Sequence, residues 1–299
     1  MLGRIGTTQM SRNFLADLGR NQVAMARLQH QQATGKKLDS PADDPVGIGI
    51  SLALRQDQAA VASWQTNIGD SMDWLRVTDS ALQNEVEVIH RARELAVRGA
   101  NGALGQEGRD KIADEIDQLA KQAAGIGNST LAGRYIFNGT AVNVAPFQEA
   151  PPGAAGALDT GLLTRDIGQS QTMSVNITGD RFQGPPGGPT IFQTLTNLST
   201  ALRAGNVTTV GGQSLTDLDS QLTNTLSLLG EVGAKTNRLE LQQSRFAIDA
   251  VARNEELSQI EDADMSKVIM DLSMHENVLK ASLSVGGRVL QPSLVDFLR

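Results

Sequence analysis

Residues 265–290, MSKVIMDLSMHENVLKASLSVGGRVL, carry the pattern that decides the fold of this chain. Apolar residues at intervals of 4, 3, 7, 4 and 7 form one stripe there: Met265, Ile269, Leu272, Leu279, Leu283 and Leu290. Residues 10–32 repeat the pattern with intervals of 4, 7 and 3: Phe14, Leu18, Met25 and Leu28. Such intervals are typical of coiled-coil seams. Since neither helix can bury its stripe alone, the two patterns predict a chain that folds back on itself, as subunits of helical polymers often do.

The charges of the two ends are complementary. Residues 1–37 carry six basic side chains and one acid, whereas residues 261–299 carry six acids and four basic side chains. Opposite charge supports the pairing of partner helices. An arginine-rich, acid-poor start is also typical of a mitochondrial transit peptide, which is the alternative for the first segment.

Further stretches between the ends carry the helical pattern. A loop with two prolines, residues 39–45, follows the first helix, and a long helix is expected over residues 46–98. Its predicted seam has intervals of 4, 7, 7 and 7: Trp64, Ile68, Leu75, Leu82 and Ile89. Shorter apolar faces predict helices around residues 112–123 and 190–202, and the longest seam of the chain predicts a helix over residues 215–260.

The stretch from residue 125 to residue 189 lacks this repeat and is rich in glycine and proline. Asn138-Gly139 predicts a hairpin turn, and residues 173–178 alternate as a half-buried strand does. We therefore expect a mainly α fold, a long antiparallel coiled-coil rod with a small β-rich insert at its tip. The expected domains are a terminal coiled coil (1–45 with 261–299), a helical rod (46–139 with 190–260) and a β-rich outer domain (140–189).

The composition favours a structural role. The chain has no cysteine, which excludes disulfides, thiolate nucleophiles and cysteine-ligated metals. A net charge of -7 argues against a general nucleic-acid binder. No stretch is apolar enough to span a membrane, and the N-terminus lacks the apolar core of a signal peptide. An aromatic content of 3% suits helix seams better than an enzyme core.

No group of residues has the spacing of a catalytic or metal site. The three histidines lie on three different predicted helices: His30, His90 and His275. His275-Glu276 begins like a zinc-protease helix, but Leu279 stands where the second histidine belongs. Asp43 and Asp44 lie between prolines and are expected to turn the chain and cap a helix rather than bind a cation. We therefore expect no enzymatic activity, no cofactor and no metal.

Three stretches carry a more specific signature. They are Ala33-Thr34-Gly35-Lys36-Lys37 with Pro41-Ala42-Asp43-Asp44-Pro45, then Gly133-Arg134-Tyr135-Ile136-Phe137-Asn138-Gly139-Thr140, and the C-terminal run from Val289 to Leu298. The first resembles the N-terminal signature of the bacterial flagellin family, and the other two resemble members that form a junction rather than the filament. The resembling helical frame covers nearly the whole chain, except for the insert between residues 150 and 172.

The resemblance implies a structural adaptor in the extracellular flagellum, at the junction between hook and filament. Its implied partners are further copies of itself, another hook-associated junction protein, flagellin and an export chaperone, without nucleic acid or membrane insertion. Export would use the flagellar type III apparatus, without a cleaved signal peptide. The terminal stripes would be poorly ordered in the free subunit and would form the assembly contacts.

Three alternatives remain open at this level, of which the weakest is a bare rod with an unrelated signalling role, such as a fragment of a chemoreceptor. The first is flagellin itself, a subunit of the filament. The second is a secreted adhesin or enzyme on a coiled-coil stalk, whose site residues would then cluster in 140–190. That segment offers no histidine and only four acids: Glu149, Asp159, Asp166 and Asp180.

Overall fold

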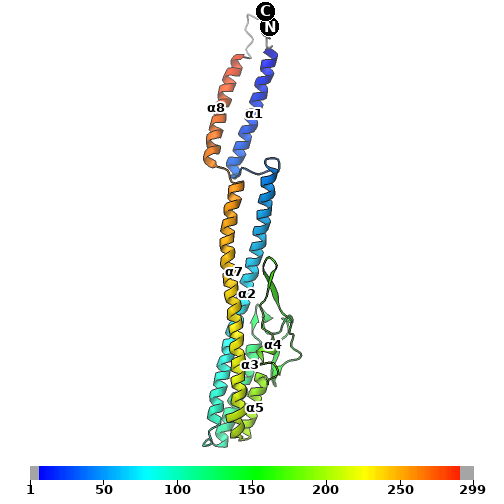
Figure 1. Cartoon of the computed structure of the whole chain (residues 1–299), viewed down its shortest axis with the longest axis vertical. Coiled ribbons are helices and arrows are strands. Elements are labelled where there is room, and N and C mark those ends of the chain that lie inside the picture. The colour runs from blue at the N-terminus through cyan, green and yellow to red at the C-terminus, as the bar shows by residue number, and fades with distance from the viewer. Residues whose placement is uncertain (1–6, 290–299) are drawn as a thin grey trace, which may run out of the picture. The chain divides into compact units, whose positions relative to one another are not determined.

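The computed structural model describes residues 7–289, and helices account for 71% of these residues, which confirms the mainly α fold class (Figure 1). Contacts divide the chain into two units: the terminal unit, residues 1–59 with 249–299, and the body unit, residues 60–248. The boundaries fall within two long helices, α2 (Pro45–Gly99) and α7 (Leu215–Glu261). The expected division into three domains remains a prediction.

The terminal unit is built around α1 (Thr7–Thr34) and α8 (Met265–Val289), which lie side by side and antiparallel (Figure 1). The predicted pairing of the two ends is therefore confirmed. Its expected electrostatic cause is not observed, because no ion pair joins α1 to α8 among residues 9–287, whose side chains the structure describes. Arg20 instead binds Asp17 of its own helix. Side-chain packing, rather than complementary charge, holds the two helices together.

Helix α1 ends at Thr34 because Gly35 adopts a left-handed backbone conformation, with φ of +71°. The Gly35 N–H donates to the carbonyl of Gln31 (2.8 Å), which satisfies one of the last carbonyls of the helix. Glycine reaches this conformation without the steric cost that a Cβ atom adds.

The loop after α1 turns the chain through the two predicted acids. The carboxylate of Asp43 accepts the N–H of Ser40 (3.1 Å), and that of Asp44 accepts the N–H of Val46 (3.0 Å). The second bond caps the start of α2, where backbone N–H groups have no partner within the helix. The expected role of Asp43 and Asp44 in turning and capping is confirmed.

The body unit contains α2 from residue 60 to its end and most of α7, together with two helices between them, α3 (Gln106–Gly127) and α5 (Ile191–Arg203). A short helix α6 (Val207–Thr209) and a π-helical turn η1 (Val210–Ser214) lead into α7. The predicted α2 seam is confirmed, since four of its residues are at most 1% exposed: Ile68, Leu75, Leu82 and Ile89.

The insert between α3 and α5 consists of three separate two-stranded antiparallel sheets and a short helix, α4 (Gly179–Phe182). The strands pair in sequence order: β1 (Thr130–Leu131) with β2 (Arg134–Tyr135), β3 (Phe147–Glu149) with β4 (Pro152–Ala154), and β5 (Thr164–Gly168) with β6 (Gln171–Ser174). The predicted β-rich character is confirmed, but two local predictions are wrong.

The hairpin turn lies at Ala132-Gly133 and not at Asn138-Gly139. Both turn residues have positive φ, +50° and +77°, as a tight two-residue turn requires. The side-chain amide of Asn138 instead donates to the carbonyls of Ala141 (3.3 Å) and Val144 (3.0 Å). Asn138 therefore closes a loop that has no paired strands.

The strand predicted at residues 173–178 ends at Ser174. The following residues do not alternate, because both Asn176 and Ile177 are buried, at 2% and 0% exposure. The amide group of Asn176 binds the N–H of Leu163 (2.9 Å) and the carbonyl of Gly161 (2.9 Å). The sequence pattern predicted that Asn176 faces solvent because asparagine is polar, whereas its side chain is buried and hydrogen-bonded.

The insert is not at the tip of a helical hairpin. Helix α3 runs back along α2, as the ion pair between Arg91 and Glu115 (2.6 Å) shows. In β5, the carbonyl of Asp166 accepts the side-chain amide of Asn67 in α2 (3.0 Å). The insert therefore lies beside the helices of the body unit, as Figure 1 shows in green.

A line of polar residues runs through the α2 core at intervals of seven: Ser71, Thr78 and Glu85, each at most 1% exposed. The two hydroxyl groups donate to carbonyls four residues earlier on the same helix. Neither carboxyl oxygen of Glu85 has a hydrogen-bond partner in the described part of the chain. Burial raises the pKa of Glu85 to about 8, so that this side chain is mostly protonated at neutral pH.

Glu85 makes the stability of the body unit depend on pH. Because the folded pKa lies above the ordinary value of 4.5, its contribution is complete below about pH 4.5 and is lost as pH rises through about 8. We expect Glu85→Gln to remove this loss, raising the free energy of unfolding at high pH by roughly 5 kcal/mol relative to the wild type. Thermal unfolding followed by circular dichroism at several pH values measures it.

The matched control is Glu87→Gln, which neutralises an exposed carboxylate on the same helix. It should keep the wild-type dependence on pH. An equally steep loss of stability in Glu85→Gln would contradict the assignment of this effect to Glu85.

Candidate assembly interface

The contact between α1 and α8 has a regular layered pattern. On α8, the buried or half-buried residues at intervals of 4, 3, 4, 3 and 4 are Val268, Leu272, His275, Leu279, Ser282 and Gly286. On α1, half-buried residues at similar intervals are Phe14, Leu18, Asn21, Met25 and Leu28. The Phe14 ring lies so close to Gly286 that a Cβ atom there would be 2.4 Å from it. These intervals are those of a coiled-coil seam.

Most of the predicted terminal stripes lie in this seam: Phe14, Leu18, Met25, Leu28, Leu272 and Leu279. Ile269 and Leu283 do not, since they are 49% and 56% exposed. Leu290 lies outside the described residues. The predicted stripe differs from the observed seam because three seam residues are polar or small and so do not stand out as apolar: His275, Ser282 and Gly286. The signal that could have located the seam is the interval of seven residues between Leu279 and Gly286, a residue small enough to admit a bulky partner.

Helix α8 also exposes a second apolar stripe, at intervals of 4, 4 and 7: Met270, Met274, Val278 and Val285. These side chains are 64%, 56%, 48% and 57% exposed. The intervals place them on one face of the helix, turned away from the seam with α1. We call this face the outer stripe of α8. Covering it would stabilise a contact by roughly 25 cal/mol for each Å² of apolar surface removed from water.

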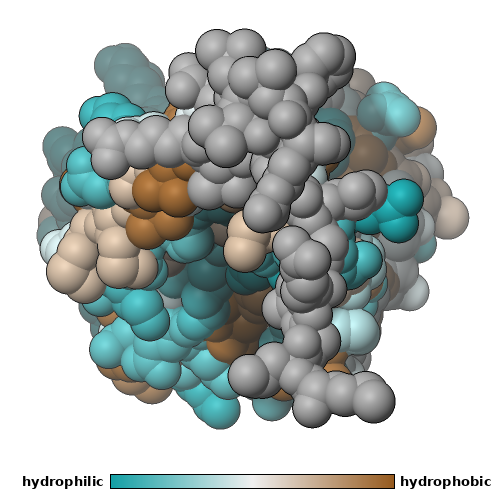
Figure 2. Space-filling view, turned by 90° about the horizontal axis from the view of Figure 1, so that it is seen from above, coloured by the Kyte–Doolittle hydropathy of each residue, from teal (hydrophilic) through white to brown (hydrophobic). Residues whose placement is uncertain are grey.

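Exposed apolar side chains are concentrated in the terminal unit. Of the 20 large hydrophobic residues that are exposed in residues 7–289, 14 belong to it, although the body unit is longer. Figure 2 shows hydrophobic side chains in brown among hydrophilic ones on the face seen from above. Concentrations of this kind mark surfaces that other chains cover.

Glu261, the last residue of α7, joins three segments of the terminal unit. Its side chain is 5% exposed and accepts hydrogen bonds from Ser51, from Nε (2.9 Å) and Nη2 (2.6 Å) of Arg55, and from Nζ of Lys36 (2.8 Å). The two-pronged contact with Arg55, helped by Lys36 and Ser51, lowers the pKa of Glu261 to about 2. We call these four residues the Glu261 hub.

Backbone hydrogen bonds also join the segments that meet at the Glu261 hub. The N–H of Lys37 donates to the carbonyl of Glu261 (2.7 Å), and the N–H of Ala263 donates to the carbonyl of Gly35 (2.9 Å). Lys36 and Asp262 form an isolated antiparallel bridge. The chain entering α2 and the chain entering α8 are thus bound to each other where the two terminal helices begin and end. Gly35 and Lys36, in the first signature stretch, serve this junction.

The second signature stretch is part of the interior of the insert. Ile136 and Phe137 are 0% exposed, and the Phe137 ring packs on that of Phe182 with centroids 4.5 Å apart. The guanidinium of Arg134 lies over the ring of Trp74 in α2, 5.9 Å from its centroid. Gly133 forms the β1–β2 turn, and Tyr135 pairs with Thr130. These residues attach the insert to the helices of the body unit.

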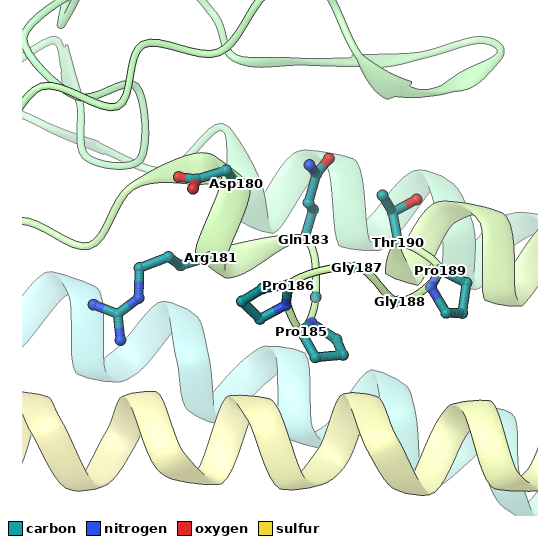
Figure 3. A pocket seen from close by; sticks show the side chains of 10 residues that line it. Asp180, Arg181, Gln183, Pro185, Pro186, Gly187, Gly188, Pro189 and Thr190 are labelled. Carbon is teal, nitrogen blue, oxygen red and sulfur yellow. The ribbon is translucent and has the colours of Figure 1, made fainter.

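Polar groups around a cavity beside the insert serve the fold. A cavity of about 230 Å³ lies along residues 180–190, where Figure 3 shows Pro185 and Pro186 beside Gln183. Arg181 binds Glu231 of α7 (2.6 Å). Thr190 caps α5 by accepting the N–H of Gln193 (3.1 Å).

The histidines described by the structure do not form a shared site. His30 contacts Asp39 (2.6 Å), and His275 contacts Asn21. No group of three or more His, Cys, Asp or Glu side chains within residues 7–289 is arranged to hold a metal ion. None of the helices in this range is long and apolar enough to cross a bilayer.

Comparison with known proteins finds similarity to flagellar proteins. The model of the bacterial flagellin N-terminal helical region matches residues 5–142. Flagellar hook-associated protein 3 of Salmonella typhimurium is 26% identical over 93% of this chain and 94% of its own length. The chain is thus similar to proteins of the bacterial flagellin family, in the N-terminal helical region and over most of its length. Another flagellin-family relative, a flagellin of Listeria innocua, is 24% identical over 94% of both chains.

The flagellin-family fold is also found among solved structures. A putative flagellar hook-associated protein from Vibrio parahaemolyticus has a TM-score of 0.67 and 21% sequence identity. The match covers 74% of this chain and 100% of that one.

The Glu261 hub makes a testable contribution to the terminal unit. Because the folded pKa lies below the ordinary value of 4.5, the contribution is present above that value and is lost as pH falls toward about 2. We expect Glu261→Gln to destabilise the unit at neutral pH by about 1 to 3 kcal/mol, since both cations are partly exposed and solvent screens them. Hydrogen exchange of α1 and α8 measures this.

Glu256→Gln is the control, because it removes an exposed carboxylate from the same end of α7. It should leave exchange in α1 and α8 unchanged. Unchanged exchange in Glu261→Gln itself would show that the backbone bonds alone hold the junction.

Proposed function

We propose that this protein is a structural adaptor subunit at the junction between the flagellar hook and filament. One observation carries the proposal: in a chain similar to flagellin-family proteins, 14 of the 20 large apolar side chains that are exposed in residues 7–289 lie on the terminal unit, where its own fold leaves them uncovered. Burial against further subunits removes this surface from water, which favours assembly. The similarity to a flagellar hook-associated protein over nearly the full length supports the junction rather than another part of the flagellum.

The assembly contacts proposed for the terminal stripes have two parts. The seam residues hold α1 against α8 within one subunit, whereas the outer stripe of α8, together with Ile269 and Leu283, faces other chains. The proposed partners are further copies of this chain, the other hook-associated junction protein on one side and flagellin on the other. The helices of the body unit would pack beside those of neighbouring subunits.

The proposed location is the extracellular flagellum, reached through the flagellar type III export apparatus without a cleaved signal peptide. An export chaperone would cover the apolar C-terminal region before secretion, since an exposed stripe of this kind promotes aggregation. In the free subunit, the paired α1 and α8 are proposed to open more readily than the body unit, so that the terminal helices are its less ordered part. The absence of cysteine suits a chain that travels unfolded into an oxidising medium.

A second candidate function is that of a filament subunit, because the chain also aligns with a flagellin over 94% of its length. Purified protein added to filament fragments separates the two. A flagellin should elongate the fragments into long filaments, whereas a junction subunit should not. In a deletion strain, the junction role predicts intact hooks, no filaments and flagellin released into the medium.

The outer stripe of α8 is tested by Met274→Glu. Met274 is 56% exposed, so the change should leave the α1–α8 pair folded and its melting temperature nearly unchanged. We expect it to reduce incorporation into flagella by about tenfold or more, because a charge buried at a subunit contact without a partner is costly. Motility and the amount of protein in isolated flagella measure the effect.

Two further variants complete this experiment. Leu279→Asp places a charge in the seam and should block incorporation while leaving the melting of the body unit nearly unchanged. Leu241→Asp, at a 74% exposed position of the body unit, controls for the loss of an exposed leucine. Normal incorporation of the Met274→Glu protein would rule out the outer stripe as an assembly contact.

A further inference from the structure

One layer of the α1–α8 seam is polar, whereas the layers beside it are apolar. The contacts of Phe14 with Gly286 and of Asn21 with His275 fix an antiparallel register. In this register Leu18 lies at the level of Leu279, and Met25 at the level of Leu272. Asn21 and His275 thus occupy a level between two apolar layers.

The polar layer is held by two hydrogen bonds. The side-chain N–H of Asn21 donates to the backbone carbonyl of His275 (3.1 Å), so that its Oδ1 faces the imidazole. Because Oδ1 can only accept, Nδ1 of His275 carries the proton and donates.

A shift of α8 by seven residues would keep most apolar side chains in contact but would break this layer. Asn21 would then lie opposite Val268, and His275 opposite Phe14. Each polar group would be half-buried against an apolar side chain without its partner, which costs more than the loss of an exposed bond. The apolar layers alone discriminate poorly between registers that differ by a whole repeat.

We propose that Asn21 and His275 are the specificity residues of the terminal coiled coil. They fix the register of α1 on α8 and favour pairing of the chain's own ends over pairing with an apolar stripe of a second copy. A single polar layer has this effect in coiled coils, where it trades stability for a unique arrangement. The proposal concerns the free subunit and does not depend on where the subunit assembles.

The Glu261 hub is the competing explanation for the register, because it ties the adjoining ends of the two segments. It holds one end of the helix pair only, and it places no constraint on pairing between copies. An experiment must therefore change the polar layer and leave the hub intact.

The lack of cysteine in the chain permits disulfide trapping without background. Leu18→Cys with Leu279→Cys reports the native register. Leu18→Cys with Leu272→Cys reports a shift of one repeat, since these positions are about 10 Å apart along the helix axis in the native register. A disulfide needs Cα atoms within roughly 4.4–6.8 Å. Purified full-length protein is oxidised mildly, and disulfides within and between chains are separated by gel electrophoresis.

With Asn21 and His275 present, the native pair should cross-link about tenfold faster than the shifted pair. In the Asn21→Leu, His275→Leu background, we expect the two rates to differ by less than about threefold and disulfides between chains to appear. Circular dichroism should show equal or higher helical stability, because an apolar layer replaces a polar one. His275→Asn, which can still hydrogen-bond to Asn21, should keep the native selectivity, and Met25→Leu should keep it as an apolar control.

Two results would overturn the proposal. If the shifted pair stays unreactive in the double leucine variant, the register is set by the hub or by the apolar layers. If the double leucine variant loses the helicity of α1 and α8, the polar layer is needed for folding rather than for specificity.

Discussion

The buried carboxylate of Glu261 is the interaction on which the arrangement of the terminal unit depends. It is the meeting point of the end of α7, the start of α2 and the residue that follows the Gly35 turn. A buried charge without partners would be strongly destabilising. The fold of the terminal unit must therefore bring Arg55, Lys36 and Ser51 within hydrogen-bond distance of the Glu261 carboxylate. Once they are, α1 and α8 leave the same junction and lie side by side.

The terminal helices divide their apolar surface between two tasks. One face closes the subunit through the seam, where Phe14 fills the space left by Gly286. The other face, including Met274, is left in water by the isolated chain. A monomer would gain by replacing these side chains with polar ones, and their presence is explained by burial in an assembly. The body unit follows the opposite rule, with Leu75 and Leu82 fully buried inside one chain.

Buried polar groups have different consequences in the two units. In the terminal unit they are satisfied, as in the Glu261 hub and the Asn21–His275 layer, and they define a unique arrangement. In the body unit Glu85 is buried without a partner and lowers stability as the pH rises. Each unmet hydrogen bond of a buried group lowers the free energy needed to open the core around it.

The sequence by itself determined the helices, the pairing of the chain ends and the turn at Asp43 and Asp44. These features depend on apolar residues at intervals of three, four and seven and on local capping, which involve only residues close together in the chain. It also carried the family resemblance. Only the tertiary structure decided which residues form the seam, since His275 and Gly286 become seam positions through their partners Asn21 and Phe14, some 250 residues away. The same holds for the insert, whose place beside α2 rests on contacts such as Asn67 with Asp166 that no local pattern encodes.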